Sequence, residues 1–155
     1  MKILLLLFAA LLVAGCGEKS SSEGSESLSD ADVERLVKDA VDFDSLEERE
    51  GLYCQTNESK PFSGWAKGMY DSGQVEELAQ LKDGKPHGPM MVWHENGQKE
   101  YEGTYKDGKA DGLWTYRHEN GQRQSETTYK DGEKVSAKYW NSKGEEVETF
   151  AESEK

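Results

Sequence analysis

Three hydrophobic patterns follow one another along the 155-residue chain. Residues 3–14 form an unbroken apolar run. Apolar residues then recur at helical spacing within residues 29–43, and short segments of alternating apolar and polar positions fill the chain from Gly64 onward. Glycine-containing turns separate these segments. The pattern predicts a mainly β protein, an elongated single sheet of β-hairpins preceded by one short helix.

The apolar run at the N-terminus is too short for a membrane-spanning helix, which needs about 20 residues. The run follows Lys2 and ends in small residues, which is the composition of a signal peptide covering residues 1–15. An uncleaved membrane anchor and a buried core helix are the alternatives, and both fit this length and these flanks less well.

The residues before Cys16 carry a second signal. The segment Val13-Ala14-Gly15-Cys16 resembles the lipobox of bacterial lipoproteins. The resemblance implies that the thiol of Cys16 takes a diacylglycerol, that the chain is cut before this residue, and that acyl chains such as palmitate hold it to a membrane. Residue 17 is Gly, not the Asp that retains many Gram-negative lipoproteins in the inner membrane. We therefore expect a lipid-anchored protein of the cell envelope, in the outer rather than the inner membrane.

A tether and a helix are predicted between this cysteine and the repeats. Residues 16–28 are rich in Ser, Gly and Glu, which predicts a flexible tether behind the lipidated cysteine. Within residues 29–43, Ser29 can cap a short amphipathic helix. Its apolar face would consist of Val33, Leu36, Val37, Ala40 and Val41. A helix this short needs a surface to dock on, and we expect it to cover the open end of the repeat array. A partner-binding helix is the alternative.

Residues 44–155 carry an internal repeat of 24 residues. The glycines that mark it are Gly64, Gly88 and Gly112; Gly73, Gly97 and Gly121; and Gly84, Gly108 and Gly132. Asn96-Gly97 and Asn120-Gly121 are dipeptides of type I′ hairpin turns, and an Asp-Gly pair marks the second turn of each unit. Each unit is therefore predicted to be a β-hairpin. The boundaries would be a cap at about 45–64, repeats at about 64–87, 88–111 and 112–135, and a partial unit at 136–150.

Two of these units resemble the MORN repeat variant family of bacterial proteins. The matching residues are Trp93, Glu95-Asn96-Gly97, Glu102 and Tyr105-Lys106-Asp107-Gly108, and then Gly112-x-Trp114-x-Tyr116, Glu119-Asn120-Gly121, Glu126 and Tyr129-Lys130-Asp131-Gly132. The resemblance covers about residues 60–150 and implies a row of stacked β-hairpins. The first unit departs from the pattern, with Leu81 in place of a tyrosine. The last is one residue short. Both look like end units.

Aromatic side chains recur within the repeat. A ladder of Tyr105, Tyr129, Trp93 and Trp114 is expected to supply much of the packing between units, because each hairpin of a single sheet touches only its neighbours. Exposed aromatic rows also suit contact with a protein or a glycan. The candidate interaction surface consists of Trp93, His94, Tyr105, Trp114, Tyr116, His118 and Tyr129.

Charge and cysteine content restrict the classes of partner that the chain is expected to bind. Removal of residues 1–15 takes away Lys2 and no acid, so the mature chain would carry 18 basic and 31 acidic side chains, a net charge of −13. This argues against nucleic acid and against docking on anionic lipid. Once Cys16 is lipidated, Cys54 has no intramolecular partner. We interpret it as a small semi-buried residue, with a reactive thiol or an intermolecular bridge as the alternatives.

No catalytic constellation is evident in the sequence. His94 and His118 occupy one place in adjacent units, but Tyr70 and Asn141 fill the flanking places, so a copied turn residue is favoured over a metal ladder. We expect no metal, no cofactor and no enzyme activity. The leading hypothesis is a membrane-anchored interaction module for an unidentified protein or cell-wall partner. The alternative, implied by the repeat resemblance, is an antitoxin-like component of a toxin–antitoxin system; an envelope enzyme ranks third.

Overall fold

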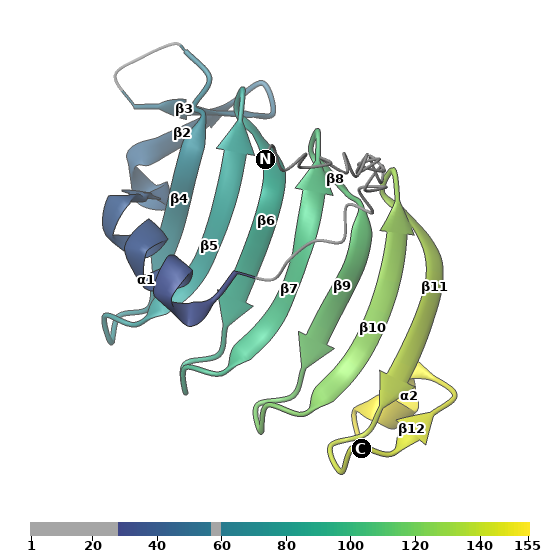
Figure 1. The fold of residues 1–155 in the computed structure, drawn as a ribbon. Helices are drawn as coiled ribbons and strands as arrows, with labels where there is room; N and C mark the ends of the chain where they lie inside the picture. Colours follow the sequence, from purple (N-terminus) through teal and green to yellow (C-terminus); the bar gives the residue numbers. More distant parts are fainter. Residues whose placement is uncertain (1–27, 57–59) are drawn as a thin grey trace, which may run out of the picture.

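The computed structural model describes residues 28–56 and 60–155 (Figure 1). The predicted signal peptide, Cys16 and the tether up to residue 27 lie outside the described residues. Within the described part, hairpins stand side by side in chain order and form one twisted sheet (Figure 1). The prediction of a mainly β protein built from a single sheet of hairpins is confirmed.

The sheet has ten strands in the described residues. They are β1 (Val41–Asp42), β4 (Gly64–Met69), β5 (Val75–Lys82), β6 (Lys85–Trp93), β7 (Lys99–Lys106), β8 (Lys109–Ala110), β9 (Gly112–Arg117), β10 (Arg123–Lys130), β11 (Glu133–Trp140) and β12 (Glu146–Val147). All the pairings are antiparallel except that of β1 with β4. The short β8 pairs with β7 just before β9 does, so these two strands act as one interrupted strand.

The Asp-Gly pairs form the type I′ turns of the sheet. Asp83 has a φ of 49° and Gly84 a φ of 77°, and the two later Asp-Gly pairs have the same left-handed values. Residues Lys82 and Lys85 pair directly across this two-residue loop. Both central residues of a type I′ turn need positive φ, which Gly and Asp tolerate better than most residues.

The Asn-Gly turns differ from the prediction. Gly97 has a φ of 81°, but Asn96 is not among the residues with positive φ, so the prediction of a type I′ turn here is wrong. The N–H of Gly97 donates to His94 O at 2.8 Å, and the N–H of His94 donates to Gln98 O at 2.8 Å. This is a three-residue loop with glycine in the left-handed position. The side chain of Asn96 sets it, because its Oδ1 accepts the N–H of Gln98 at 2.9 Å.

The face of the sheet that α1 (Asp30–Asp39) covers is called here the helix face. Helix α1 begins as predicted, with the Ser29 hydroxyl accepting the N–H of Asp32. Leu78 and Met91 are buried beneath it, at 0% and 2% exposure. The residues packed around them are Ala40, Leu28, Val33, Leu36, Val37, Trp65 and Trp93. The apolar stripe of the helix therefore packs on strands β4 to β6.

The prediction that this helix covers the open end of the array is wrong. It lies across the face of the first strands, where its apolar stripe packs on Leu78 and Met91 (Figure 1). The end is covered instead by β1, since the chain leaves the helix at Asp39 and pairs Val41 with Ala66 of β4. The helix is correspondingly shorter than the predicted segment 29–43.

The N-terminal cap packs on the opposite face. It consists of η1 (Phe43–Ser45) and the hairpin of β2 (Leu46–Arg49) and β3 (Leu52–Gln55). The side chains that pack it onto Ala66 and Leu81 of the sheet are Leu46, Val41, Phe43, Tyr53 and Phe62. The sequence also predicts that residues 52–54 and 61–64 pair as a hairpin of this cap, and this pairing is present only in part. Cys54 and Pro61 form an isolated antiparallel bridge, and the N–H of Phe62 donates to Tyr53 O at 2.8 Å. The main partner of β3 is β2, across the left-handed turn of Glu50 and Gly51.

Trp114 is the core of the middle repeats. It is 3% exposed, and its ring lies so close to Gly103 that a Cβ there would come within 2.2 Å of it. The glycine is therefore needed for the tryptophan to lie flat on the neighbouring strand. Trp93 does not belong to this ladder, contrary to prediction, because it lies on the helix face against α1. Ala137 in the last unit takes the position that Trp114 has in this repeat. The two residues pair with Thr127 from its two sides.

The C-terminal end is covered by the short helix α2 (Phe150–Ser153). The ring of Phe150 contacts that of Tyr139 edge-on, with centroids 6.0 Å apart. Tyr139, Ser125 and Tyr116 pair across adjacent strands, and directly paired residues share a face. Helix α2 therefore packs on the same face as Trp114, opposite to α1.

Trp114→Ala tests the packing of the array. It would leave a cavity between strands β7, β9 and β10, so we expect a loss of about 3–5 kcal/mol in the free energy of unfolding, measured by urea denaturation. The control is Leu113→Ala, the preceding residue, which is 48% exposed and lies on the other face. Equal stability of Trp114→Ala and wild type would contradict the role of this ring.

Candidate functional site

Four of the seven predicted surface residues meet on one face of the sheet. Trp114 is surrounded by Tyr105, Tyr116 and Tyr129, with ring centroids 4.9, 6.4 and 6.2 Å from its own. Tyr101 joins them, 6.0 Å from Trp114 and 5.4 Å from Tyr116. These five residues are called here the tyrosine floor. They come from β7, β9 and β10, whose alternation points them to the same side.

Burial divides the tyrosine floor into a support and a surface. Trp114 is too buried for contact with a partner, so its predicted place in the interaction surface is corrected to a supporting role. The four tyrosines are half-buried and keep part of each ring exposed. Burial raises the pKa of Tyr116 to about 12, with the nearby Tyr129 adding to the effect. Burial likewise raises the pKa of Tyr101 and Tyr105. The phenols of Tyr101, Tyr105 and Tyr116 therefore stay protonated at neutral pH, as hydrogen-bonding groups on an apolar surface.

Both caps leave the tyrosine floor open. The N-terminal cap packs over Ala66 and Leu81 of β4 and β5, and α2 packs beside Tyr139 of β11. Ala66, Ala79, Met90 and Gly103 pair in register from strand to strand, so the cap and the floor lie on one face. The floor is thus the part of this face between two covered ends.

The helix face over the same strands is polar. Glu102 lies between Lys99, at 2.8 Å, and Arg117, at 3.0 Å. Burial acts to raise the pKa of Glu102, but the hydrogen bonds from these two cations outweigh it, and the pKa lies below its usual value. The two cations neutralise the charge of this carboxylate within the sheet, so Glu102 has no unpaired charge for a partner to bind.

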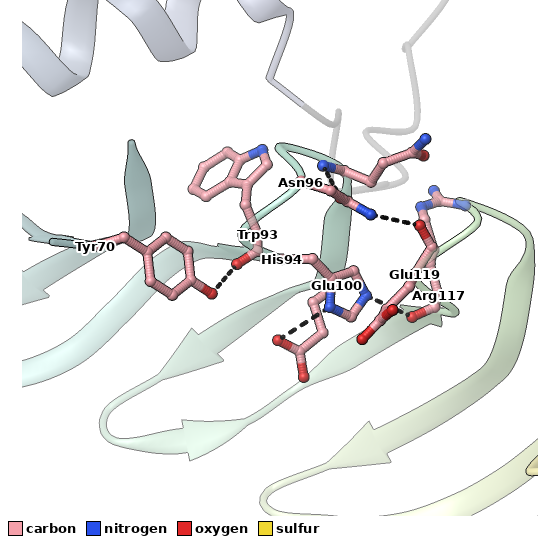
Figure 2. Close-up of polar contacts among 8 residues, drawn as sticks. Tyr70, Trp93, His94, Asn96, Glu100, Arg117 and Glu119 are labelled. Carbon is pink, nitrogen blue, oxygen red and sulfur yellow. Dashed lines mark hydrogen bonds and ion pairs between the residues drawn. The ribbon is translucent and has the colours of Figure 1, made fainter. Parts of the chain in front are cut away.

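His94 and His118 join each repeat to the next at the Asn-Gly edge. The Nε2–H of His94 donates to the carbonyl of Arg117 at 3.2 Å (Figure 2). The Nε2–H of His118 donates to the carbonyl of Trp140 at 3.1 Å. Tyr70 does the same one repeat earlier, donating to Trp93 O at 2.6 Å. These hydrogen bonds give a physical reason why histidine recurs beside the Asn-Gly turns of adjacent repeats. Each side chain satisfies a backbone carbonyl of the following hairpin.

The turn asparagines reinforce these contacts. Asn96 Nδ2 donates to the carbonyl of Glu119 at 2.8 Å (Figure 2). Asn120 Nδ2 donates to the carbonyl of Ser142 at 2.9 Å. At the opposite edge, the N–H of Gly108 donates to Pro86 O at 2.8 Å. Neighbouring hairpins are therefore held at both of their ends as well as along the strands.

Two residues of this face were missed by the sequence reasoning. Tyr101 alternates with Gly103 and Tyr105 along β7, a signal visible in the sequence. Glu77 lies 24 residues before Tyr101 and pairs with Val92, which in turn pairs with Tyr101. The repeat therefore places a carboxylate where the next unit has a tyrosine. Alignment of the units by their period would have found both.

No metal-ligating cluster is present in the described residues. Across residues 28–56 and 60–155, no group of three or more His, Cys, Asp and Glu side chains is arranged to hold a metal ion. Cys54 is buried at 4% exposure and unpaired. None of the helices in this part of the chain is long and apolar enough to cross a membrane.

The comparisons with known proteins agree with the repeat architecture. Residues 86–107 and 110–131 match the MORN repeat variant family. No curated protein and no solved structure matches the chain. The two matched segments contain β6 to β10, so they are the repeats that carry the tyrosine floor. MORN repeats are generally protein- or membrane-interaction modules, and two segments of this chain are similar to them.

His118→Ala tests the edge contact between repeats. It leaves the carbonyl of Trp140 without its side-chain donor, so we expect a loss of about 0.5–1.5 kcal/mol in unfolding free energy. The control is Glu119→Ala, an exposed neighbour whose backbone is unchanged. Zinc titrated into the wild-type protein should give no heat of binding in calorimetry. Zinc binding that His118→Ala abolishes would contradict the structural role.

Proposed function

We propose that this chain is a membrane-anchored lipoprotein of the cell envelope whose repeat sheet is a non-enzymatic interaction module. It binds a partner protein through the tyrosine floor. The observation that carries the proposal is the clustering of half-exposed tyrosines on the part of one sheet face that neither cap covers. The N-terminal cap and α2 pack on either side of the floor on that face. On the other face, β7 and β9 carry the ion-paired Glu102 and the exposed Leu113, and the first strands lie under α1.

Tyrosine suits this role for two physical reasons. Its ring is large and rigid, so it gives up little conformational entropy on binding, and its hydroxyl can bond to polar groups of the partner. Here the rings are already held by Trp114 and by one another, with centroids 4.9–6.4 Å apart. A surface ordered before binding keeps more of its contact energy as affinity.

The charge of the chain favours a protein partner. A net charge of −13 for the chain after Gly15 repels anionic wall polymers and attracts basic surfaces. A wall glycan is thus the less favoured partner. The antitoxin-like alternative requires a cytoplasmic toxin as partner, which fits poorly with a lipidated N-terminus.

The anchor supplies the location. Lipidation at Cys16 and a twelve-residue tether would hold the sheet within about 20 Å of the membrane surface, at random-coil dimensions. Leu28, the first described residue, packs against the core beneath α1 on the helix face.

Site-specific photo-crosslinking in intact cells tests the binding surface. A photoreactive phenylalanine in place of Tyr101 should crosslink a defined envelope protein. The same group in place of Leu113, which is exposed on the other face, should not. Equal products from both positions, or none from either, would overturn the proposal. A cytoplasmic toxin as the product would favour the antitoxin-like alternative, and a wall glycan would replace the protein partner.

Cys16→Ala tests the anchor separately. Without the thiol there is no acceptor for the diacylglycerol, so the variant should lose incorporation of labelled fatty acid and leave the membrane fraction. Conversion of the other cysteine, Cys54→Ala, is the matched control and should retain both. A Cys16→Ala protein that stays labelled and membrane-bound would disprove lipidation at this residue.

A further inference from the structure

Glu77 lies at the N-terminal border of the tyrosine floor. It belongs to β5 and faces the same side as Tyr101, with Val92 of β6 paired between them. Val92 is 8% exposed, so the surface that joins the acid to the rings is apolar and packed. The row continues from Tyr101 to Tyr116. A carboxylate therefore stands at the end of an aromatic row on the open part of this face.

The sheet accommodates this carboxylate without neutralising it. Gly68 on the neighbouring strand makes room, because a Cβ there would lie 2.9 Å from Cγ of Glu77. Burial raises the pKa of Glu77, and the adjacent Glu76 raises it further. The ion pairs formed among the described residues leave this side chain out, whereas Glu102 on the helix face has two cations.

An unpaired, half-buried carboxylate is unfavourable in the free protein and is relieved by a cation. Glu77 and Tyr101 stand on alternate strands, roughly 10 Å apart at the backbone, with Val92 between them. A guanidinium or ammonium group above Val92 would be within reach of both the carboxylate and the Tyr101 ring, whose electron-rich face attracts cations. Glu77 lies close enough to the Tyr101 phenol for its negative charge to raise the pKa of that phenol, although burial is the larger cause. The two side chains thus offer one cation both a salt bridge and an aromatic face.

We propose that Glu77 and Tyr101 form a subsite for an arginine or lysine side chain of the partner protein. The inference rests on the proposed function and adds the chemistry of the partner: a basic segment that lies along the row from Glu77 to Tyr116. The overall acidity of the chain acts in the same direction, by steering a basic partner toward it.

The test uses the purified full chain and three capped peptides of alternating sequence, with arginine, glutamine or glutamate at every second residue and alanine between. Binding is followed by fluorescence anisotropy of a labelled peptide at about 0.15 M salt, where long-range attraction is largely screened. The arginine peptide should bind, and the glutamine and glutamate peptides should not. Loss of the partner cation's hydrogen-bonded salt bridge in Glu77→Gln should weaken arginine-peptide binding about tenfold.

Glu76→Gln is the matched control. It removes the same charge one residue away, on an exposed side chain that alternation directs to the other face. Its effect on peptide binding should stay within about twofold, since only distant electrostatics change. Because Glu77→Gln relieves a half-buried charge, this variant should unfold at or above the wild-type temperature, so lost binding cannot be attributed to misfolding.

Each other outcome counts against the subsite. Equal weakening by Glu76→Gln and Glu77→Gln would show general electrostatic attraction only, and absence of arginine-peptide binding would remove the basis for a basic partner. The proposed function is judged separately by the Tyr101 crosslink. If that crosslink persists undiminished in the Glu77→Gln background, the surface binds a partner without the cation subsite. If no crosslink forms at all, both proposals fail.

Discussion

The fold depends on how a single-layer sheet buries apolar surface when there is no second layer to pack against. The answer in the middle repeats is Trp114, whose ring lies over Gly103 of the adjacent strand and meets four tyrosine rings. The missing Cβ at Gly103 turns the backbone itself into a packing surface. At either end of the array, where the central position holds Ala66 or Ala137, a separate cap supplies the apolar cover. Caps and tryptophan are thus alternative solutions to one constraint.

The edges solve the second problem of a row of hairpins, which is that each touches only its neighbours. At the Asn-Gly edge, Tyr70, His94 and His118 each donate a hydrogen bond to a backbone carbonyl in the next repeat. The three side chains differ in chemical type, but each carries a hydrogen-bond donor that reaches a backbone carbonyl of the next repeat. This explains why histidine recurs there without any metal chemistry. It also fixes the twist between hairpins, and with it the relative positions of the tyrosines on β7, β9 and β10.

The 24-residue period made the sheet and its strand order predictable from the sequence, and the helical spacing of apolar residues after Ser29 made the start of α1 predictable. The side-chain roles were harder. Period-2 alternation shows which residues share a face, but not which face a helix will cover, and so the place of α1 was missed. Trp93 was grouped with Trp114 because both are tryptophans, although Trp93 occupies the repeat position of Arg117 and faces the other way. The prediction of the Asn-Gly turn type failed for a local reason. The side-chain amide of Asn96 bonds to the backbone of Gln98, and φ at Asn96 stays negative.

The two faces of the sheet differ in their properties because the strand register places different residues in the rows on each face. On the helix face, Leu78 and Met91 pair onward to Glu102 and Thr115, so an apolar start under α1 becomes a polar surface whose charges are matched internally. On the opposite face, Glu77 and Val92 pair onward to Tyr101 and Tyr116, so an unmatched acid leads into aromatic rings. The first row satisfies its own charges and needs no partner. The second leaves a half-buried charge and half-exposed rings in place on a scaffold held at both edges, which is the surface that we propose a partner completes.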